Sequence, residues 1–387
     1  MNNILDQFKS IPNYCILILL SATAIAVGIE WDISWHESIG RDTLWSPPHM
    51  VVYFGGILCG LTCAWMVFQQ TFFNPDKYIH HVKFWGFKGP LACWICIWGT
   101  IAMLTSAPFD NWWHNTYGLD VQIISPPHIV LAMGIFAIIL GSVLLILAER
   151  NLVDDHRKRI FDFVYLYAAS LILIQFCIVL TEYSFANKQH SYEYYKFSAV
   201  IYGFIIIAFS QASKMTFSAT VITALFFIHR LLVLWILPLF EAEPLLGPIY
   251  RPIDHYVAPP FPPLLFIPAV IIDLYRKKID IQNKIIKAII LGISFSSIIL
   301  LTQWFFSEFL LSENGRNWIF GTDRNKPFWV PVGEFNYQFW DFDMTPYGHK
   351  IPMRPMSILG FITITLYTTI SMYAALHFSN WLKKVKR

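Results

Sequence analysis

Two stretches of the chain, residues 32–49 and 110–128, carry the same pattern of histidine and carboxylate side chains. Each stretch begins with an aspartate that is followed four positions later by a histidine. Each then ends in Ser-Pro-Pro-His, with 12 residues between the two histidines in the first copy and 13 in the second. The side chains that could do chemistry are Asp32, His36 and His49 in the first copy, and Asp110, His114 and His128 in the second.

This spacing predicts two metal sites. Residues four apart share one face of a helix, so the aspartate and the first histidine of each copy can point at one object. Proline suits the first turn of a helix, so His49 should lie just inside a helix start. Two imidazoles and one carboxylate bind Fe(II), Cu or Zn and leave positions open for water, oxygen or substrate. The alternative is a duplicated structural corner, in which these residues only tie a loop to a helix.

The composition is that of a membrane protein, because 56% of the 387 residues are hydrophobic and only 14% are charged. We expect an all-α, polytopic integral membrane bundle of about ten transmembrane helices in contact with lipid. The net charge of +3 gives no indication of nucleic-acid binding. The predicted spans are 13–30, 47–68, 88–107, 125–148, 160–183, 196–213, 216–239, 258–275, 286–310 and 355–380.

The positive charges predict the orientation of these spans. Most of the 28 Lys and Arg residues fall on one side when the N-terminus is placed inside the cell. Both termini should then be cytoplasmic, with both histidine motifs at the periplasmic or outer face. We divide the chain into a four-helix metal-binding module, 1–150, and a six-helix module of unidentified role, 151–387, which carries an outer loop at 311–354.

Two further groups inside the predicted spans invite interpretation. Four cysteines lie on the second and third helices, where they could form a thiolate site for Cu(I) or pack as small apolar side chains. In the seventh helix, the adjacent His229 and Arg230 need a carboxylate partner, and we consider Glu182 and Glu308. This pair could be structural or could serve as a relay. The four cysteines are Cys59, Cys63, Cys93 and Cys96.

The first motif resembles the C subunit of the particulate methane and ammonia monooxygenases, which are copper membrane monooxygenases. The resemblance covers about residues 10–150. In that family an Asp-x3-His-x12-His set supplies a copper site, and an Asn-x3-His-x13-His set supplies a second site. The matching residues are Asp32, Trp35-His36-Glu37, Arg41-Asp42-Thr43, Pro47, His49 and Val51-Val52-Tyr53.

The resemblance implies two copper sites, dioxygen as a reactant and hydroxylation of a small apolar substrate. It also implies partner subunits and a quinol or similar electron donor. The sequence departs from the family because Asp110 stands where the family has Asn, because fewer helices precede the first motif, and because the six later helices have no match. The ligands by themselves accept iron as readily as copper.

We expect the second set, Asp110, His114 and His128, to be the catalytic one. Apolar and aromatic residues surround it, and a dry pocket suits a small apolar substrate. The first set should be structural or should relay electrons, with Glu37, Asp42 and, at the second set, Asp120 orienting the ligands. Arg41 could pair with Asp42. Two other functions stay open: a membrane copper-handling or transport protein, and a structural or assembly subunit of a larger membrane redox complex.

Overall fold

The computed structural model describes most of the chain and divides it into two compact units. The first unit comprises residues 1–29, 43–172 and 381–387, and the second comprises 30–42 and 173–380. The division falls inside the three helices Asn13–Ser38, Asp155–Val179 and Ile358–Leu382, whereas the division at residue 150 expected from the sequence stays a prediction. The described residues are 11–40, 43–75, 80–118, 125–245, 253–278, 281–315, 317–321 and 353–386.

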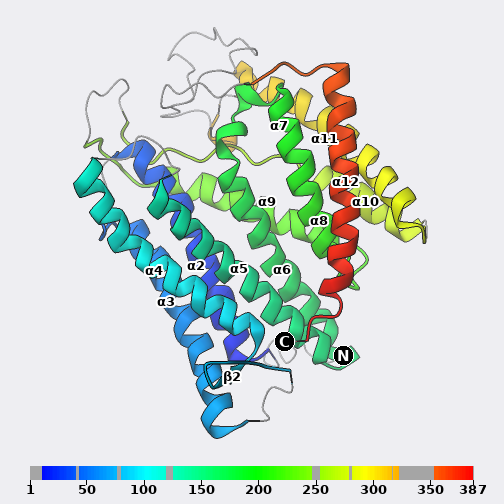
Figure 1. The fold of residues 1–387 in the computed structure, drawn as a ribbon. Helices are drawn as coiled ribbons and strands as arrows, with labels where there is room; N and C mark the ends of the chain where they lie inside the picture. The colour runs from blue at the N-terminus through cyan, green and yellow to red at the C-terminus, as the bar shows by residue number, and fades with distance from the viewer. Residues whose placement is uncertain are drawn as a thin grey trace. The chain divides into compact units, whose positions relative to one another are not determined.

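The described part of the chain is mostly helical with two short strands, as expected of an all-α protein (Figure 1). Eight of its helical segments are long and apolar enough to cross a bilayer, which makes the protein a multi-pass, all-α membrane protein. They are α2 (Asn13–Ser38), α3 (Pro47–Phe68) with η1 (Gln69–Phe73), α4 (Leu91–Tyr117), α5 (Pro126–Leu152), α6 (Asp155–Val179), α9 (Ser218–Ile236) with η5 (Leu237–Leu239), α11 (Lys284–Leu311) and α12 (Ile358–Leu382).

The other two predicted spans take different forms. The sixth is a helical segment made of α7 (Tyr192–Phe197), the short π-helix η4 (Ser198–Tyr202) and α8 (Gly203–Ser210). In place of the eighth, residues 256–264 are not helical, and only the 13-residue α10 (Phe266–Lys278) follows. Prolines at 259, 260, 262 and 263 explain this difference, because proline lacks a backbone N–H and disfavours helix in the residue before it.

Short connecting elements complete the described chain. Strands β1 (Val82–Phe84) and β2 (Phe87–Gly89) form an antiparallel hairpin between α3 and α4. Its turn residues Trp85 and Gly86 both have positive φ, the conformation of a tight hairpin turn. Besides η5, the described 3-10 helices are η2 (Thr181–Tyr183), η3 (Ala186–Lys188), η6 (Glu313–Gly315) and η7 (Trp318–Phe320). Most of the predicted outer loop, residues 322–352, lies outside the described residues.

In the first unit, α3, α4 and α5 are consecutive antiparallel helices that lie side by side (Figure 1). Glycines bring their backbones together. A Cβ on Gly99 of α4 would lie 2.7 Å from the Gly134 carbonyl oxygen of α5, and a Cβ on Gly134 would lie 2.7 Å from the Gly99 oxygen. Close approach at small residues is a common way to pack membrane helices. This contact fixes the end of α4 relative to the start of α5.

In the second unit, the last part of α2 carries a buried carboxylate that pairs with α9. Glu30 accepts hydrogen bonds from Arg230 and from His229, whose Nε2 lies 2.8 Å from a Glu30 oxygen. Arg230 also donates to the Pro260 carbonyl at 3.2 Å. Each charged side chain is almost fully buried. A buried charge is costly unless it is paired and hydrogen-bonded, and this cluster provides both kinds of contact.

Candidate metal centre

Asp110, His114 and His128 converge within the first unit, from the last turns of α4 and the first turn of α5. Asp110 and His114 are one helical turn apart near the end of α4. His128 is the third residue of α5, after Pro126 and Pro127 at its first two positions. The Asp-x3-His spacing and the Pro-Pro-His sequence therefore have the local structures predicted for them.

The Asp110 carboxylate lies between the two imidazoles. His114 Nε2 is 3.3 Å from Asp110 Oδ2, and His128 Nε2 is 3.6 Å from Asp110 Oδ1. The side chains of Asp110 and His114 are each 25% exposed, and that of His128 is 35% exposed. The two Nε2 atoms thus face one carboxylate in a partly shielded position at a helix end.

The other ring nitrogen of each histidine has a partner that orients the ring. His114 Nδ1 lies 3.2 Å from the Gly118 carbonyl oxygen, and His128 Nδ1 lies 3.0 Å from Ser125 Oγ. A carbonyl oxygen can only accept, so His114 must carry a proton on Nδ1. Neutral His114 therefore has its lone pair on Nε2, facing Asp110. Histidines that ligate metals through Nε2 are held in this way.

Glycine makes the His114 contact possible. Gly118 has a φ of +91°, a backbone conformation that L side chains rarely adopt, and its carbonyl turns back toward the ring. Gly40, the aligned residue of the first motif, has a φ of +82° and also lies four residues after a histidine. Both motifs therefore place a glycine of positive φ at the end of their first helix.

The arrangement leaves a buried acceptor atom without a hydrogen bond. Asp110 Oδ1 is buried and has no hydrogen-bond partner among the described residues. With neutral His114, a lone pair of Nε2 faces an anionic carboxylate, and that contact is repulsive unless a proton or another cation lies between them. The carboxylate between two imidazoles therefore calls for a cation, which is either a bound transition metal or the proton of a protonated imidazole.

The first motif reproduces parts of this geometry. Asp32 and His36 lie one turn apart on α2, with His36 Nε2 3.8 Å from Asp32 Oδ2. His49 is the third residue of α3, after two prolines, and its Nδ1 lies 2.8 Å from the Thr43 carbonyl oxygen. Asp32 and His36 belong to the second unit and His49 to the first, so the convergence of all three stays a prediction.

Aromatic residues of α4 lie near the second motif, but Trp112 and Tyr117 are exposed, so the dry pocket expected there stays a prediction. The ring of Phe109 stacks on Trp112, with centroids 5.9 Å apart, and Trp113 lies 4.5 Å from Tyr117. These rings flank the Asp110 and His114 pair on α4. The residues expected to orient the ligands, Asp42 and Asp120, lie outside the described residues together with Arg41, so their roles stay predictions.

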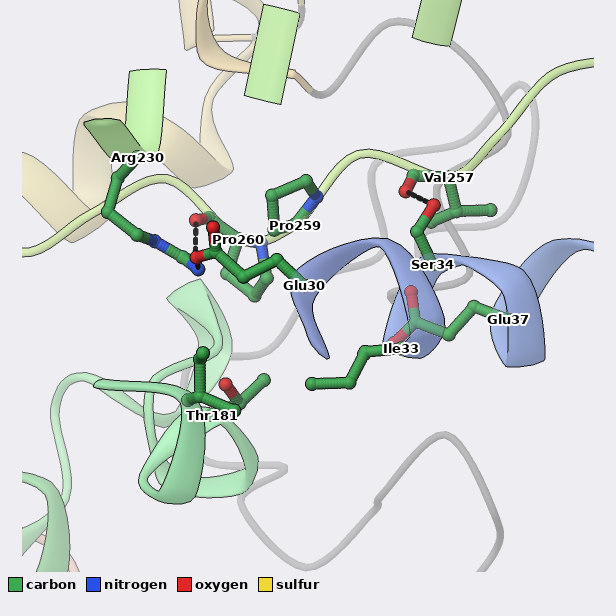
Figure 2. A pocket seen from close by; sticks show the side chains of 10 residues that line it. Glu30, Ile33, Ser34, Glu37, Thr181, Arg230, Val257, Pro259 and Pro260 are labelled. Atoms are coloured by element: carbon green, nitrogen blue, oxygen red, sulfur yellow. Dashed lines mark hydrogen bonds and ion pairs between the residues drawn. The ribbon is translucent and has the colours of Figure 1, made fainter. Parts of the chain in front are cut away.

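The sequence analysis missed the partner of Arg230. That partner is Glu30 of α2, not Glu308, whose carboxylate lies 3.7 Å from His190 instead. The Glu182 side chain lies outside the described residues. Figure 2 shows Arg230 reaching Glu30 at a small pocket that Glu37 also lines, with room for about one water molecule. A lone Glu inside an apolar run was the signal available in the sequence.

No family model matches the sequence, and no curated protein or solved structure matches it either.

Proposed function

We propose that this protein is a metal-dependent oxidoreductase subunit of the copper membrane monooxygenase type, with its reactive site at Asp110, His114 and His128. The observation that carries the proposal is the Asp110 carboxylate between two Nε2 atoms, with the opposite nitrogens held by Gly118 and Ser125. The resemblance of the first motif to the copper monooxygenases supports copper over iron, which the same ligands would accept.

The residues of the chain have distinct tasks in this proposal. His114, His128 and Asp110 hold the metal, and the Gly118 carbonyl and Ser125 hydroxyl keep both Nε2 atoms directed at it. Bound copper would supply the activation of dioxygen. A small apolar substrate would lie beside the aromatic side chains of Trp112 and Trp113. Partner subunits and a quinol or similar donor would deliver electrons, and the site would lie at the outer face with both termini cytoplasmic.

The test compares His114→Ala with His36→Ala in membranes that contain any partner subunits. Oxygen consumption with ammonia or a small hydrocarbon is measured beside the amount of assembled protein. We expect both variants to assemble and His114→Ala to lose turnover.

The same two variants also distinguish this proposal from its two alternatives. Full turnover in assembled His114→Ala, with loss in His36→Ala, would reverse the assignment of the reactive site. Loss of stability alone in both variants, with unchanged turnover per assembled molecule, would favour a structural subunit whose histidines only hold helix ends.

A further inference from the structure

A second group of metal-binding atoms lies inside the first unit, away from the histidines, where α3 packs against α4. Cys59 and Cys63 are one turn apart on α3, and Cys93 and Cys96 are nearly one turn apart on α4. All four side chains have no solvent exposure. Their helices approach closely, because a Cβ on Gly60 would lie 2.6 Å from a Thr100 side-chain carbon.

The sulfur atoms of this group lie close enough to share one ion. The Sγ atoms of Cys59, Cys63 and Cys96 all lie within 4.8 Å of one another. Cys63 also makes a side-chain contact with Cys93, whose Sγ lies 3.7 Å from Met66 Sδ. Three thiols thus converge, and a fourth thiol and a thioether lie next to them.

The chemistry of these atoms selects a soft cation. Thiolate and thioether ligands favour Cu(I), Zn and iron–sulfur clusters over hard cations. Structural zinc sites take four ligands, whereas three thiols converge within 4.8 Å among the described residues. Cu(I) carries a single charge, so two thiolates leave only one negative charge while the third sulfur stays a neutral thiol.

We propose that Cys59, Cys63 and Cys96 form a buried Cu(I) site, with Cys93 and Met66 as neighbouring soft ligands. Binding replaces protons: two thiols lose their protons to the solvent, two Cu–S bonds form, and copper stays in the +1 state throughout. The proposal does not rest on the proposed function, because it uses different residues and needs neither oxygen nor substrate.

Close packing of small side chains is the competing explanation, and the same chain offers a comparison. Cys177 is also buried in a membrane helix, but it belongs to the second unit and to no such group among the described residues. If both cysteines serve only in packing, replacing Cys177 or Cys63 should have the same effect on Cu(I) binding. If Cys63 is a copper ligand, only its replacement should remove the bound Cu(I).

The experiment uses the whole chain in lipid nanodiscs, with His36→Ala and His114→Ala together as the background to remove copper bound at either histidine motif. Cu(I) is presented anaerobically in competition with a coloured Cu(I) chelator. We expect the background protein to retain one equivalent of Cu(I), the added Cys63→Ala to lose it, and the added Cys177→Ala to retain it. Equal retention by Cys63→Ala and Cys177→Ala would overturn the proposal.

X-ray absorption of the background protein gives a second measurement that needs no cysteine variant. We expect the retained copper to be coordinated by sulfur only. Nitrogen or oxygen coordination of all bound Cu(I), or binding of Zn(II) with no Cu(I) bound, would overturn the proposal even if the cysteine variants fail to fold.

Discussion

The hydrogen bonds at Nδ1 of His114 and His128 determine how the Nε2 atoms of these two rings are directed. A histidine in a simple surface ion pair is free to rotate, whereas these two rings are held by Gly118 and Ser125 at 3.2 and 3.0 Å. A hydrogen bond at Nδ1 raises the basicity of Nε2 and fixes the direction in which Nε2 points. The orienting contacts therefore provide a test of metal binding that leaves all three ligands in place.

Ser125→Ala removes the partner of His128 Nδ1 without removing a ligand. The Ser125 side chain makes no capping hydrogen bond to α5, so the helix start should be kept. We expect copper affinity at this site to fall by about 10–100-fold, as for other losses of a group that orients a ligand. Competition titration measures this change.

Ser142→Ala is the matched control, because Ser142 is a buried serine of the same helix that bonds to its own backbone at Ile138. Equal affinities of Ser125→Ala and Ser142→Ala would show that the His128 ring needs no orientation.

A different histidine, His190, gives a prediction about pH. Burial lowers the pKa of His190 below its usual value, and the nearby Glu308 only partly opposes this shift. Above the unfolded pKa of about 6.5 both states are neutral and His190 contributes no pH dependence. Below that value the unfolded chain takes up the proton more readily, so the free energy of unfolding should fall as the pH falls.

The check is the thermal midpoint of the wild type and of His190→Gln between pH 5 and 8 in detergent. The wild-type midpoint should decrease more steeply below pH 6.5 than that of the variant. Parallel curves would mean that His190 does not contribute to the acid sensitivity of the fold.

At the scale of the elements, the contact between α4 and α5 holds Asp110 near His128. Gly134 leaves no space for a side chain, because a Cβ there would lie 2.7 Å from the backbone nitrogen of Met103. Gly134→Ala should therefore push the helices apart and destabilise the protein by about 1–3 kcal/mol, in the range of overpacked cores. It should also weaken copper binding at His128.

Thermal unfolding and copper titration measure both effects of Gly134→Ala. Met133→Leu is the control, since Met133 is its sequence neighbour and is well exposed on the helix surface. A Gly134→Ala protein as stable as Met133→Leu would contradict the importance of this close approach.

The helices show what sequence patterns can and cannot predict. Long apolar runs predicted the membrane-spanning helices because hydropathy and length are local properties. The proline-rich segment before α10 was included in a span because its residues are apolar, although prolines prevent the helix. The pairing of Glu30 with Arg230 could not be foreseen, since the two residues are separated by 200 positions and nothing local joins them.

For the candidate metal centre, too, the sequence predicted the local structure but not the contacts between distant residues. Asp-x3-His and Pro-Pro-His are short-range patterns, and each correctly placed its residues on a helix. The partners of the ring nitrogens were not foreseen, because a backbone carbonyl such as that of Gly118 leaves no signature in the residue types. The positive φ of Gly118 could have been suspected from the repeated glycine at position 40.

For the whole molecule, the distribution of positive charge predicts one orientation in the membrane. The positive charges predict that the end of α4 faces outward and that the start of α6 faces the cytoplasm. Thr116 and Arg159 are exposed residues at these two ends. All six native cysteines are buried, so an impermeant maleimide should label the unmodified protein poorly.

We expect Thr116→Cys to be labelled in intact cells and Arg159→Cys only after the membrane is broken. The opposite pattern would invert the predicted orientation and place the histidine site on the cytoplasmic side.

The metal content of the purified protein tests the central claim most directly. The wild type, His128→Ala and His377→Ala should be purified from membranes grown with both copper and iron, and the bound metals should be counted and their ligands identified by X-ray absorption. His377 is the control because it is an exposed histidine on α12. We predict nitrogen-coordinated copper in the wild type and His377→Ala, and the loss of one equivalent of it in His128→Ala. An unchanged amount of nitrogen-coordinated copper in folded His128→Ala, or iron or zinc in its place in the wild type, would contradict a copper centre at Asp110, His114 and His128.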